Sequence, residues 1–354
     1  MHQVIVGAAA GDAITDHALL IQRWLRQDGY VSEIYAEHIH PNVAAAVQPF
    51  ASYRPGRQPW LIFHHSVGDP LVERVVNLSP RLILIYHNIT PPHFFVGIDP
   101  AWVQRARLGQ QQLAQLQPRT GLALAVSEYN AQDLWATGFT EVEILPLPLE
   151  AARYQTPLNE TLAAELRRQP GPRLLFVGRL APNKRQEDLL KLLYYLRRLR
   201  PSAHLALVGD PWVVGYGDWL QRQAAALGLA DALRLAGKVS QTDLITYYRC
   251  ADLFVSMSEH EGFGKPLVES MFLGLPVLAY AAGAAAATLG NAGILFHHKH
   301  YPALAELIHL LLDDVPLRQN LIAAQKQRAA AFLEPPIYQT WQTLLRRLPA
   351  LQQK

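Results

Sequence analysis

Short, uninterrupted apolar runs alternate with longer segments of helical periodicity along most of this chain. Runs that are apolar at every position are typical of parallel strands covered by helices on both faces. In the first half, such runs lie at residues 60–64, 82–86 and 122–126, and residues 3–7 and 142–145 are interpreted as further strands. A second series of expected strands lies at residues 174–177, 204–208, 233–236, 253–255 and 276–279. The alternation predicts an α/β protein with two doubly wound parallel sheets.

The segment between the two series, residues 146–172, is polar and interrupted by prolines. Such a change of composition is typical of a connection between domains. The chain has 354 residues, which is long enough for two cores. We therefore expect Rossmann-like domains at residues 1–150 and 151–335, facing a central cleft.

Composition and charge exclude several classes of protein. Half of the residues are hydrophobic and 17% are charged, which rules out a disordered chain. The single cysteine, Cys250, rules out a disulfide framework and fits a reducing cytosol. A net charge of +3 suits an anionic small molecule or a membrane surface, but it is too small to indicate nucleic acid. The N-terminus lacks the basic start of a signal peptide, so we expect a cytoplasmic protein.

Residues 271–296 contain no charged side chain and are long enough on paper to span a bilayer. They also contain several glycines, a proline and many alanines, and such a stretch inserts poorly into a membrane. We therefore expect a buried helix, a strand and a loop in this segment.

Ligands of doubly wound sheets bind at the carboxyl ends of the strands, so the loops there are searched first. Gly178 and Arg179 follow the run at residues 174–177, and Lys184 stands just before a helix. Gly178 lets the backbone turn close to a ligand. Two cations beside the positive end of a helix dipole form a receptor for a diphosphate, although a solvated basic turn has the same composition.

A second loop, residues 258–265, leads into a short helix. Pro266 suits the first turn of that helix, and Gly274 suits its end. Glu261 lies in the loop, whereas Glu269 lies on the helix among apolar residues and is expected to be buried. A buried carboxylate needs hydrogen-bond donors, and a sugar diol supplies two hydroxyls.

These two loops resemble the donor-binding loops of a known enzyme family. Glu261 and Glu269 enclose seven residues, as in the E-x7-E pattern of retaining glycosyltransferases. Residues 177–180 together with Lys184 are similar to the donor-phosphate loop of that group, and the spacing between the loops also fits. The chain thus resembles a family 4 glycosyltransferase (glycosyltransferase group 1) with the GT-B fold.

The likeness is strongest over residues 174–296. In the first half, residues 126–130 and 145–148 are similar to segments that close the acceptor domain of the family. The resemblance implies that the first domain binds the acceptor and that the second binds a nucleotide sugar. It also implies that a C-terminal helix in residues 336–354 packs back on the first domain.

Members of the family transfer a sugar from a nucleotide-diphosphate sugar to an acceptor hydroxyl, with retention at the anomeric carbon and without a required metal. By resemblance, Arg179 and Lys184 bind the diphosphate next to Gly178 and stabilise the charge that grows on the leaving phosphate. Glu261 holds hydroxyls of the transferred sugar, and Glu269 holds the ribose hydroxyls. No metal or other cofactor is expected.

The resemblance implies further donor contacts in the second domain. The backbone amides of Phe263, Gly264 and Lys265 contact the sugar and the phosphate. Lys238 and Val239 lie against the base, although a solvated turn residue is an equal alternative for Lys238.

Four residues of the first domain are also candidates. Gly11 resembles the glycine whose amide approaches the donor phosphate. Asp12 either meets the acceptor or caps the following helix. His87 follows the run at residues 82–86, and the resemblance places it as a catalytic residue near the reacting sugar and the acceptor; a loop histidine without such a role is the alternative. Glu128 is a candidate for acceptor binding.

The chain departs from the family at one place. Many relatives carry a Pro-Glu pair near residues 286–287, whereas this chain has Ala286 and Ala287. The donor contact made by that glutamate is therefore not carried over to this chain.

The function expected from the resemblance is a metal-independent retaining hexosyltransferase of polysaccharide or glycolipid biosynthesis. GDP-mannose is the favoured donor and UDP-glucose the second, and the acceptor is a saccharide or a lipid-linked sugar at the inner face of the cytoplasmic membrane. Three alternatives stay open. A GT-B-shaped nucleotide-sugar epimerase needs a carboxylate pair that the first half does not offer. A NAD-dependent oxidoreductase needs a dinucleotide fingerprint that the chain lacks. The third is a non-catalytic nucleotide-sugar-binding protein.

Overall fold

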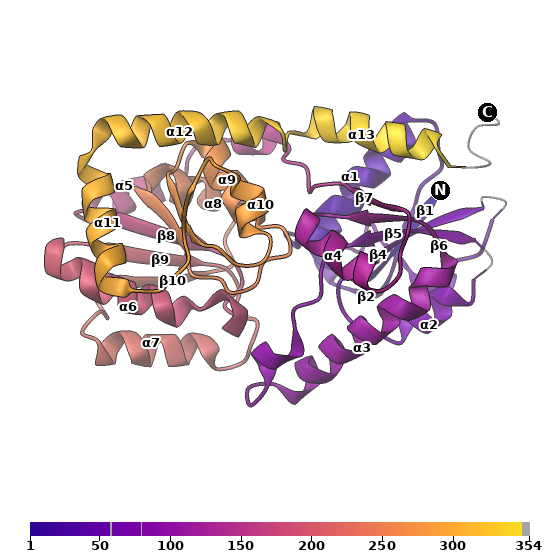
Figure 1. The fold of residues 1–354 in the computed structure, drawn as a ribbon, viewed down its shortest axis with the longest axis horizontal. Coiled ribbons are helices and arrows are strands. Elements are labelled where there is room, and N and C mark those ends of the chain that lie inside the picture. Colours follow the sequence, from indigo (N-terminus) through magenta and orange to yellow (C-terminus); the bar gives the residue numbers. More distant parts are fainter. Residues whose placement is uncertain (57–58, 79, 349–354) are drawn as a thin grey trace. The chain divides into compact units, whose positions relative to one another are not determined.

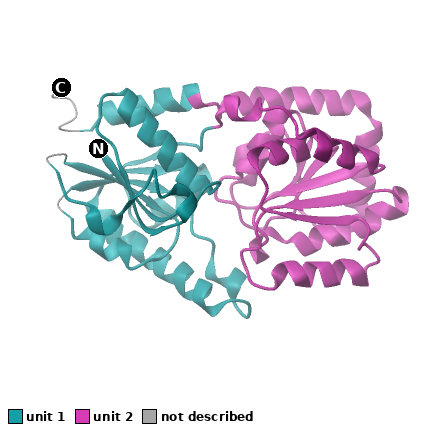
Figure 2. Ribbon diagram, turned by 180° about the vertical axis from the view of Figure 1, so that it is seen from behind, with its two compact units in different colours: residues 1–148, 335–354 teal, residues 149–334 magenta. Residues whose placement is uncertain are grey.

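A parallel β-sheet forms the centre of each of the two units into which the chain divides (Figure 1; Figure 2). Unit 1 comprises residues 1–148 and 335–354, and unit 2 comprises residues 149–334. Along the chain, unit 2 is therefore inserted into unit 1. The computed structural model describes residues 1–56, 59–78 and 80–348.

Unit 1 has a seven-stranded sheet in the order β3-β2-β1-β4-β5-β6-β7. Its strands are β1 (His2–Ala8), β2 (Ile34–Ile39), β3 (Gln48–Pro49), β4 (Trp60–His65), β5 (Arg81–Tyr86), β6 (Thr120–Ala125) and β7 (Val142–Ile144). Strands β4 and β5 are almost completely buried, as their continuous apolar sequences require. The order of the sheet reverses between β1 and β4, which is the point at which doubly wound sheets bind ligands.

Helices lie on both sides of this sheet (Figure 1). They are α1 (Ala13–Gln27), α2 (Leu71–Val76), α3 (Pro100–Leu116), α4 (Glu128–Ala136) and α13 (Glu334–Arg346). Helix α1 begins at the cap residue Asp12 and buries Trp24 and Leu25 on its inner face. Helices α2 and α3 and strand β2 were not expected, because their sequences are more polar and carry no continuous apolar run.

Unit 2 has a six-stranded parallel sheet in the order β10-β9-β8-β11-β12-β13. Its strands are β8 (Arg173–Val177), β9 (His204–Val208), β10 (Leu233–Gly237), β11 (Leu253–Ser256), β12 (Val277–Tyr280) and β13 (Ile294–Phe296). The order of this sheet reverses between β8 and β11. The loops that follow these two strands are the ones that the sequence singles out.

Eight α-helices surround the sheet of unit 2 within the described part of the chain. They are α5 (Glu160–Arg168), α6 (Gln186–Leu199), α7 (Tyr216–Ala226), α8 (Gln241–Cys250), α9 (Lys265–Leu273), α10 (Ala285–Leu289), α11 (Tyr301–Asp313) and α12 (Val315–Ala330). The uncharged segment at residues 271–296 folds into the end of α9, β12, α10 and β13. Among the described residues, no helix has the length and apolar character that crossing a membrane requires.

The last helix, α13, packs on α1 of unit 1. Trp341 is fully buried, and its ring centre lies 6.3 Å from that of Trp24. Tyr338 Oη and Gln342 Nε2 both donate to Asp28 Oδ1, at 2.7 and 2.8 Å. Helix α13 is thus part of the core of unit 1.

The two segments at which unit 2 begins and ends pair with each other. Leu149 N–H donates to the Phe332 carbonyl at 2.7 Å, and Glu334 N–H donates to the Leu149 carbonyl at 3.1 Å. Leu149 and Leu333 form an isolated parallel bridge. The first and last segments of unit 2 are therefore joined by backbone hydrogen bonds.

Candidate functional site in the strand-end loops

The loops after β8 and β11 bring a cation and a carboxylate into contact. Lys184 Nζ lies 2.7 Å from Glu261 Oε2, and less than a fifth of either side chain is exposed. Lys184 ends a short 3₁₀ turn, and its Nζ also lies 3.4 Å from the His260 carbonyl oxygen. The structure thus pairs the expected phosphate-binding lysine with the expected sugar-binding carboxylate at the reversal point of the sheet.

Arg179 lies in the same loop and is exposed. Its guanidinium carbon is 5.1 Å from the centre of the Trp212 ring, which is the geometry of a cation–π contact. Gln186 Nε2 donates to the Arg179 carbonyl at 2.9 Å and ties the loop to the start of α6. An exposed guanidinium can bind a phosphate through two hydrogen bonds.

Backbone contacts hold the Glu261 loop in place. Ala284 N–H donates to the Glu261 carbonyl at 2.9 Å. A Cβ atom on Gly283 would lie 2.6 Å from that carbonyl oxygen, and the φ of Gly283 is +56°, so this position requires glycine. Asn183 Nδ2 donates to the His260 carbonyl at 3.2 Å. These contacts join the loop after β11 both to the loop after β8 and to the turn before α10.

A buried ion network lies beside the loop. Lys299 Nζ donates to Glu259 at 2.7 Å and to Asp188 at 2.9 Å. Asp188 is buried and also accepts from Lys191 Nζ and Tyr301 Oη. Burial alone raises a carboxyl pKa, but the hydrogen bonds from Lys299, Lys191 and Tyr301 hold the pKa of Asp188 well below its usual value. Asp188 is therefore ionised and anchors α6 next to the site.

Glu269, on α9, is 4% exposed and is held by two tyrosines. Tyr154 Oη donates to its Oε1 and Tyr248 Oη to its Oε2, each at 2.6 Å. Burial, together with the charge of Glu269, raises the pKa of Tyr248 well above its usual value, so this hydroxyl remains a donor. The tyrosines already supply the donors that a sugar diol was expected to supply, and the ribose contact of Glu269 stays a prediction.

Phe263, Gly264 and Lys265 lie where the loop enters α9. The Phe263 ring packs edge-on against Phe332 with centres 5.6 Å apart, and its carbonyl accepts from Thr288 Oγ1 at 2.5 Å. Gly264 is the cap residue of α9 and has a φ of +85°. The first N–H groups of a helix have no acceptor within it, so this turn offers donors and a partial positive charge.

Lys238 and Val239 stand apart from these residues. They follow β10, which is the edge strand of the sheet and is separated from β8 by β9. Lys238 is exposed, and its Nζ lies 3.8 Å from Asp210 Oδ2. The structure therefore does not bring Lys238 into the Lys184–Glu261 pair.

In unit 1, Gly11 is exposed and has a φ of +76°, just before α1. Asp12 Oδ2 accepts from the N–H groups of Ile14 and Thr15, at 3.2 and 3.1 Å. Of the two roles expected for Asp12, the structure shows the helix cap. Glu128 opens α4 and is exposed, so its carboxylate is available to a ligand.

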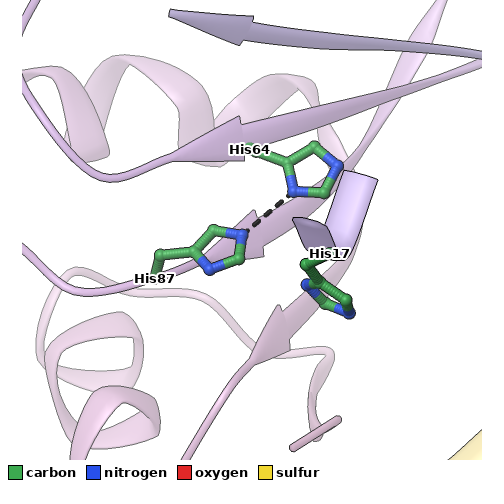
Figure 3. A group of neighbouring side chains, drawn as sticks. All are labelled: His17, His64 and His87. Atoms are coloured by element: carbon green, nitrogen blue, oxygen red, sulfur yellow. Dashed lines mark hydrogen bonds between the residues drawn. The ribbon is translucent and has the colours of Figure 1, made fainter. Parts of the chain in front are cut away.

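His87 follows β5 and lies in a group with His64 and His17 (Figure 3). His64 Nδ1 and His87 Nε2 share a hydrogen bond of 3.0 Å. The His17 ring stands nearly perpendicular to both of the other rings. Burial, followed by the nearby His64, His17 and His65, holds the pKa of His87 well below its usual value, so the ring is neutral.

The three histidines offer ring nitrogens within 4.8 Å of one another, and such a group could hold a metal ion. The nitrogens that bind one tetrahedral zinc ion stand about 3.4 Å apart, because each lies about 2.0–2.1 Å from the metal. In the structure, His64 and His87 instead share one proton at 3.0 Å. The observed arrangement is that of a hydrogen-bonded pair beside a third ring.

Sequence reasoning missed four residues of these two groups: His17, His64, Tyr154 and Tyr248. One signal was available, because His64 lies at the end of β4 and His87 follows β5, and these strands are neighbours in the sheet. The tyrosines of Glu269 gave no signal, since Tyr154 is 115 positions away along the chain.

Comparison with known proteins supports the reading of unit 2. Residues 159–328 match the model of the family described as glycosyl transferases group 1. The matched segment contains both strand-end loops.

Curated relatives are similar over part of their length. The chain is 31% identical over 235 residues to a D-inositol 3-phosphate glycosyltransferase of Frankia alni, in a match that covers 64% of this chain and 58% of that protein. It is 28% identical over 214 residues to a glycogen synthase of Mycobacterium tuberculosis, covering 60% of this chain and 48% of that protein. The chain spans about half the length of the curated relatives it matches.

Solved structures are similar over the whole fold. Anabaena Alr3699/HepE, solved in complex with UDP-glucose, superposes with a TM-score of 0.78 at 18% identity, over 98% of this chain and 100% of that one. WaaG, a glycosyltransferase involved in lipopolysaccharide biosynthesis, gives a TM-score of 0.71 at 15% identity, over 99% and 100%. Together with the two parallel sheets, this likeness confirms the expected GT-B fold.

Proposed function

Because residues 159–328 match the family described as glycosyl transferases group 1, we propose that the chain belongs to it and transfers a sugar from a nucleotide-diphosphate sugar to an acceptor hydroxyl. The observation that carries the proposal is the contact between Lys184 and Glu261, 2.7 Å apart at the reversal point of the sheet in unit 2. A cation for the diphosphate and a carboxylate for the sugar are the two groups that such a donor needs at one place.

The roles that we propose follow from charge. As the glycosidic bond breaks, negative charge grows on the phosphate oxygens, and Arg179 and Lys184 stabilise it. Lys184 exchanges Glu261 for the diphosphate when the donor binds, and Glu261 then accepts hydrogen bonds from sugar hydroxyls. The leaving phosphate takes the proton of the acceptor hydroxyl on the same face, so the anomeric configuration is retained and no metal is needed.

We propose a UDP-hexose as the donor, with UDP-glucose first. The support is the likeness to Alr3699/HepE, whose structure was solved with UDP-glucose. GDP-mannose, which the family resemblance favoured, is the competing donor. A saccharide or lipid-linked acceptor at the inner face of the cytoplasmic membrane agrees with the resemblance and with the net charge of +3.

The proposal is tested by thermal shift with UDP, GDP, ADP and their hexose conjugates, followed by turnover measurements. A ligand that binds only the native state raises the melting temperature. We expect a shift with UDP and a larger one with UDP-glucose. Lys184→Ala should lose both shifts and lower kcat by about 10²–10³-fold, as removal of a donor to a developing oxyanion does.

Glu261→Gln tests binding of the sugar separately from binding of the nucleotide. It should keep the shift with UDP but lose the additional shift with UDP-glucose, because Glu261 is assigned to the sugar alone. Arg222→Ala, at an exposed position of α7, is the matched control and should behave as the wild type. Loss of UDP binding in Arg222→Ala, or normal turnover in Lys184→Ala, contradicts the proposal. Binding without turnover with any acceptor would indicate the non-catalytic alternative.

A further inference from the structure

A chain of hydrogen bonds in unit 1 leads from the backbone of α1 to His87. Gln3 Nε2 donates to the Ala18 carbonyl at 2.9 Å. A carbonyl only accepts, so this contact fixes which end of the Gln3 amide carries the NH₂ group. Gln3 Oε1 consequently faces His64 Nε2, 3.0 Å away. An amide oxygen also only accepts, and the His64 proton therefore lies on Nε2.

The next link follows from the charge of His64. His64 is 1% exposed, and burial together with the nearby His17 holds its pKa well below its usual value. A neutral imidazole has a single N–H, and His64 uses it on Gln3. Its Nδ1 can then only accept. Because that atom lies 3.0 Å from His87 Nε2, the proton between the two rings belongs to His87.

The last link concerns the outer nitrogen of His87. The ring is neutral and carries its one proton on Nε2, so Nδ1 bears a lone pair. Figure 3 shows Nδ1 on the side of the ring that points away from His64. Within the described part of the chain, the other hydrogen bond of His87 runs from its backbone N–H to the His65 carbonyl, at 2.9 Å. Nδ1 is thus the atom with which the side chain can meet a ligand.

We infer that Gln3 and His64 are positioning residues that fix the tautomer of His87, so that His87 Nδ1 accepts a hydrogen bond from a hydroxyl of the bound sugar or acceptor. The identity of this ligand rests on the proposed function, whereas the tautomer itself does not. Gln3 on β1 and His64 on the neighbouring strand β4 thereby determine whether His87 Nδ1 accepts or donates a hydrogen bond.

The inference has a consequence for specificity. A fixed acceptor at Nδ1 requires a group that donates, and a hydroxyl does so. A deoxyfluoro sugar keeps an electronegative atom of similar size but cannot donate. The analogue fluorinated at the recognised hydroxyl should therefore bind as weakly as the deoxy sugar. With either analogue, His87 Nδ1 has no hydrogen-bond donor to pair with.

The tautomers are read directly by two-bond ¹H–¹⁵N correlation spectra of the full chain labelled with ¹⁵N-histidine. At pH 7 we expect His64 and His87 to be neutral with the proton on Nε2. His65 is an internal reference, because its Nε2 donates to the Gly109 carbonyl at 2.9 Å and must carry a proton. A His87 that carries its proton on Nδ1, or that is charged, overturns the inference.

Two variants test the cause. Gln3→Met keeps the volume but removes both hydrogen bonds, so both tautomers should appear in the His64 and His87 signals. Gln3→Glu places a carboxylate against His64 and should charge that ring. His64 Nδ1 would then donate to His87 Nε2, so that His87 carries its proton on Nδ1. The matched control is Gln22→Met, since Gln22 is a buried glutamine of α1 that donates to the Ser32 carbonyl. Unchanged His87 tautomers in Gln3→Met contradict the positioning role.

The ligand is tested with UDP-glucose and its deoxy and deoxyfluoro analogues, one ring position at a time. We expect one position at which both analogues raise KM or lower kcat at least tenfold in the wild type. In Gln3→Glu the fluoro analogue at that position should recover relative to the natural sugar, because Nδ1 then donates. If the spectra show the expected tautomers but no sugar perturbs the His87 signal, the proposed ligand is wrong, whereas the assigned tautomers of His64 and His87 are kept.

Titration with Zn²⁺ alone tests whether the three histidines bind a metal instead. Tight binding with loss of the His87 N–H signal would make them a metal site and overturn the inference.

Discussion

Buried neutral histidines make unit 1 sensitive to acid. His65 is completely buried, and burial lowers its pKa to about 4 although its ring donates to Gly109. In the unfolded chain its pKa is about 6.5. Below that value the unfolded state binds a proton that the folded state does not. The stability associated with His65 is therefore fully present above pH 6.5 and is lost as the pH falls toward 4.

This gives a prediction for His65→Gln. The glutamine can still donate to the Gly109 carbonyl but does not titrate. Between pH 7 and pH 5, the free energy of unfolding of the wild type should fall by about 2 kcal/mol more than that of the variant. Urea unfolding at the two pH values measures the difference. Equal losses in both proteins would show that His65 titrates normally in the folded state.

Residue types singled out Lys184 and Glu261, but they predicted neither the contact between the two nor its surroundings. Arg179, Lys184 and Glu261 were singled out because strand-end loops, charge and spacing are all visible along the chain. The buried state of Glu269 was also predicted, since it sits among apolar residues. Its tyrosine partners were not, because each contact joins residues that only the packing of the fold brings together.

Among the elements, most strands were predictable, including the edge strands β7 and β10, whereas elements without a clear apolar pattern were not. Strands β4, β5 and β9 are buried and leave continuous apolar runs, so their bounds were found to within about one residue. Strand β13 and helix α10 lie in a run of alanines and glycines that has no clear period, and neither was separated from its neighbours. Strand β2 is polar at its exposed end, which lies beyond Tyr35 and Ala36, the two residues that pair with the short edge strand β3.

The turn before α10 allows a prediction at the scale of one element. Gly283→Ala would place a Cβ atom 2.6 Å from the Glu261 carbonyl oxygen at a φ of +56°. Because that contact is with backbone, the Glu261 loop must shift. We expect a loss of about 1–3 kcal/mol in stability and a tenfold or larger drop in kcat/KM. Thermal unfolding and donor turnover measure the two effects.

Gly217→Ala is the matched control for this variant. Gly217 lies in α7, and its added Cβ would meet its nearest neighbour, Leu180 Cδ1, at an ordinary 3.7 Å. The control should leave stability and turnover within error of the wild type or raise stability slightly. If Gly283→Ala behaves in the same way, the loop is not held as the structure indicates.

At the scale of the molecule, helix α13 belongs to the core of unit 1. Trp341→Ala removes a fully buried ring that packs near Trp24, and it should cost about 3–5 kcal/mol of stability. Thermal and urea unfolding measure this loss. Trp135→Ala is the control, because Trp135 is a tryptophan of unit 1 that is 52% exposed, and it should change stability by no more than about 0.5 kcal/mol. Similar losses in the two variants would contradict the packing of α13.

The discontinuity of unit 1 fixes an order of events during synthesis. Residues 1–148 leave the ribosome first, but the helix that covers Trp24 is made only after all of residues 149–334. At about 5–20 residues per second, that interval lasts roughly 10–40 s. Unit 2 is continuous along the chain, and its first and last segments pair with each other. It can therefore finish folding before α13, the last helix of unit 1, has been made. Unit 1, whose larger segment is translated before unit 2, is therefore completed after it, and the apolar face of α1 around Trp24 is a binding site for a chaperone until α13 has been made.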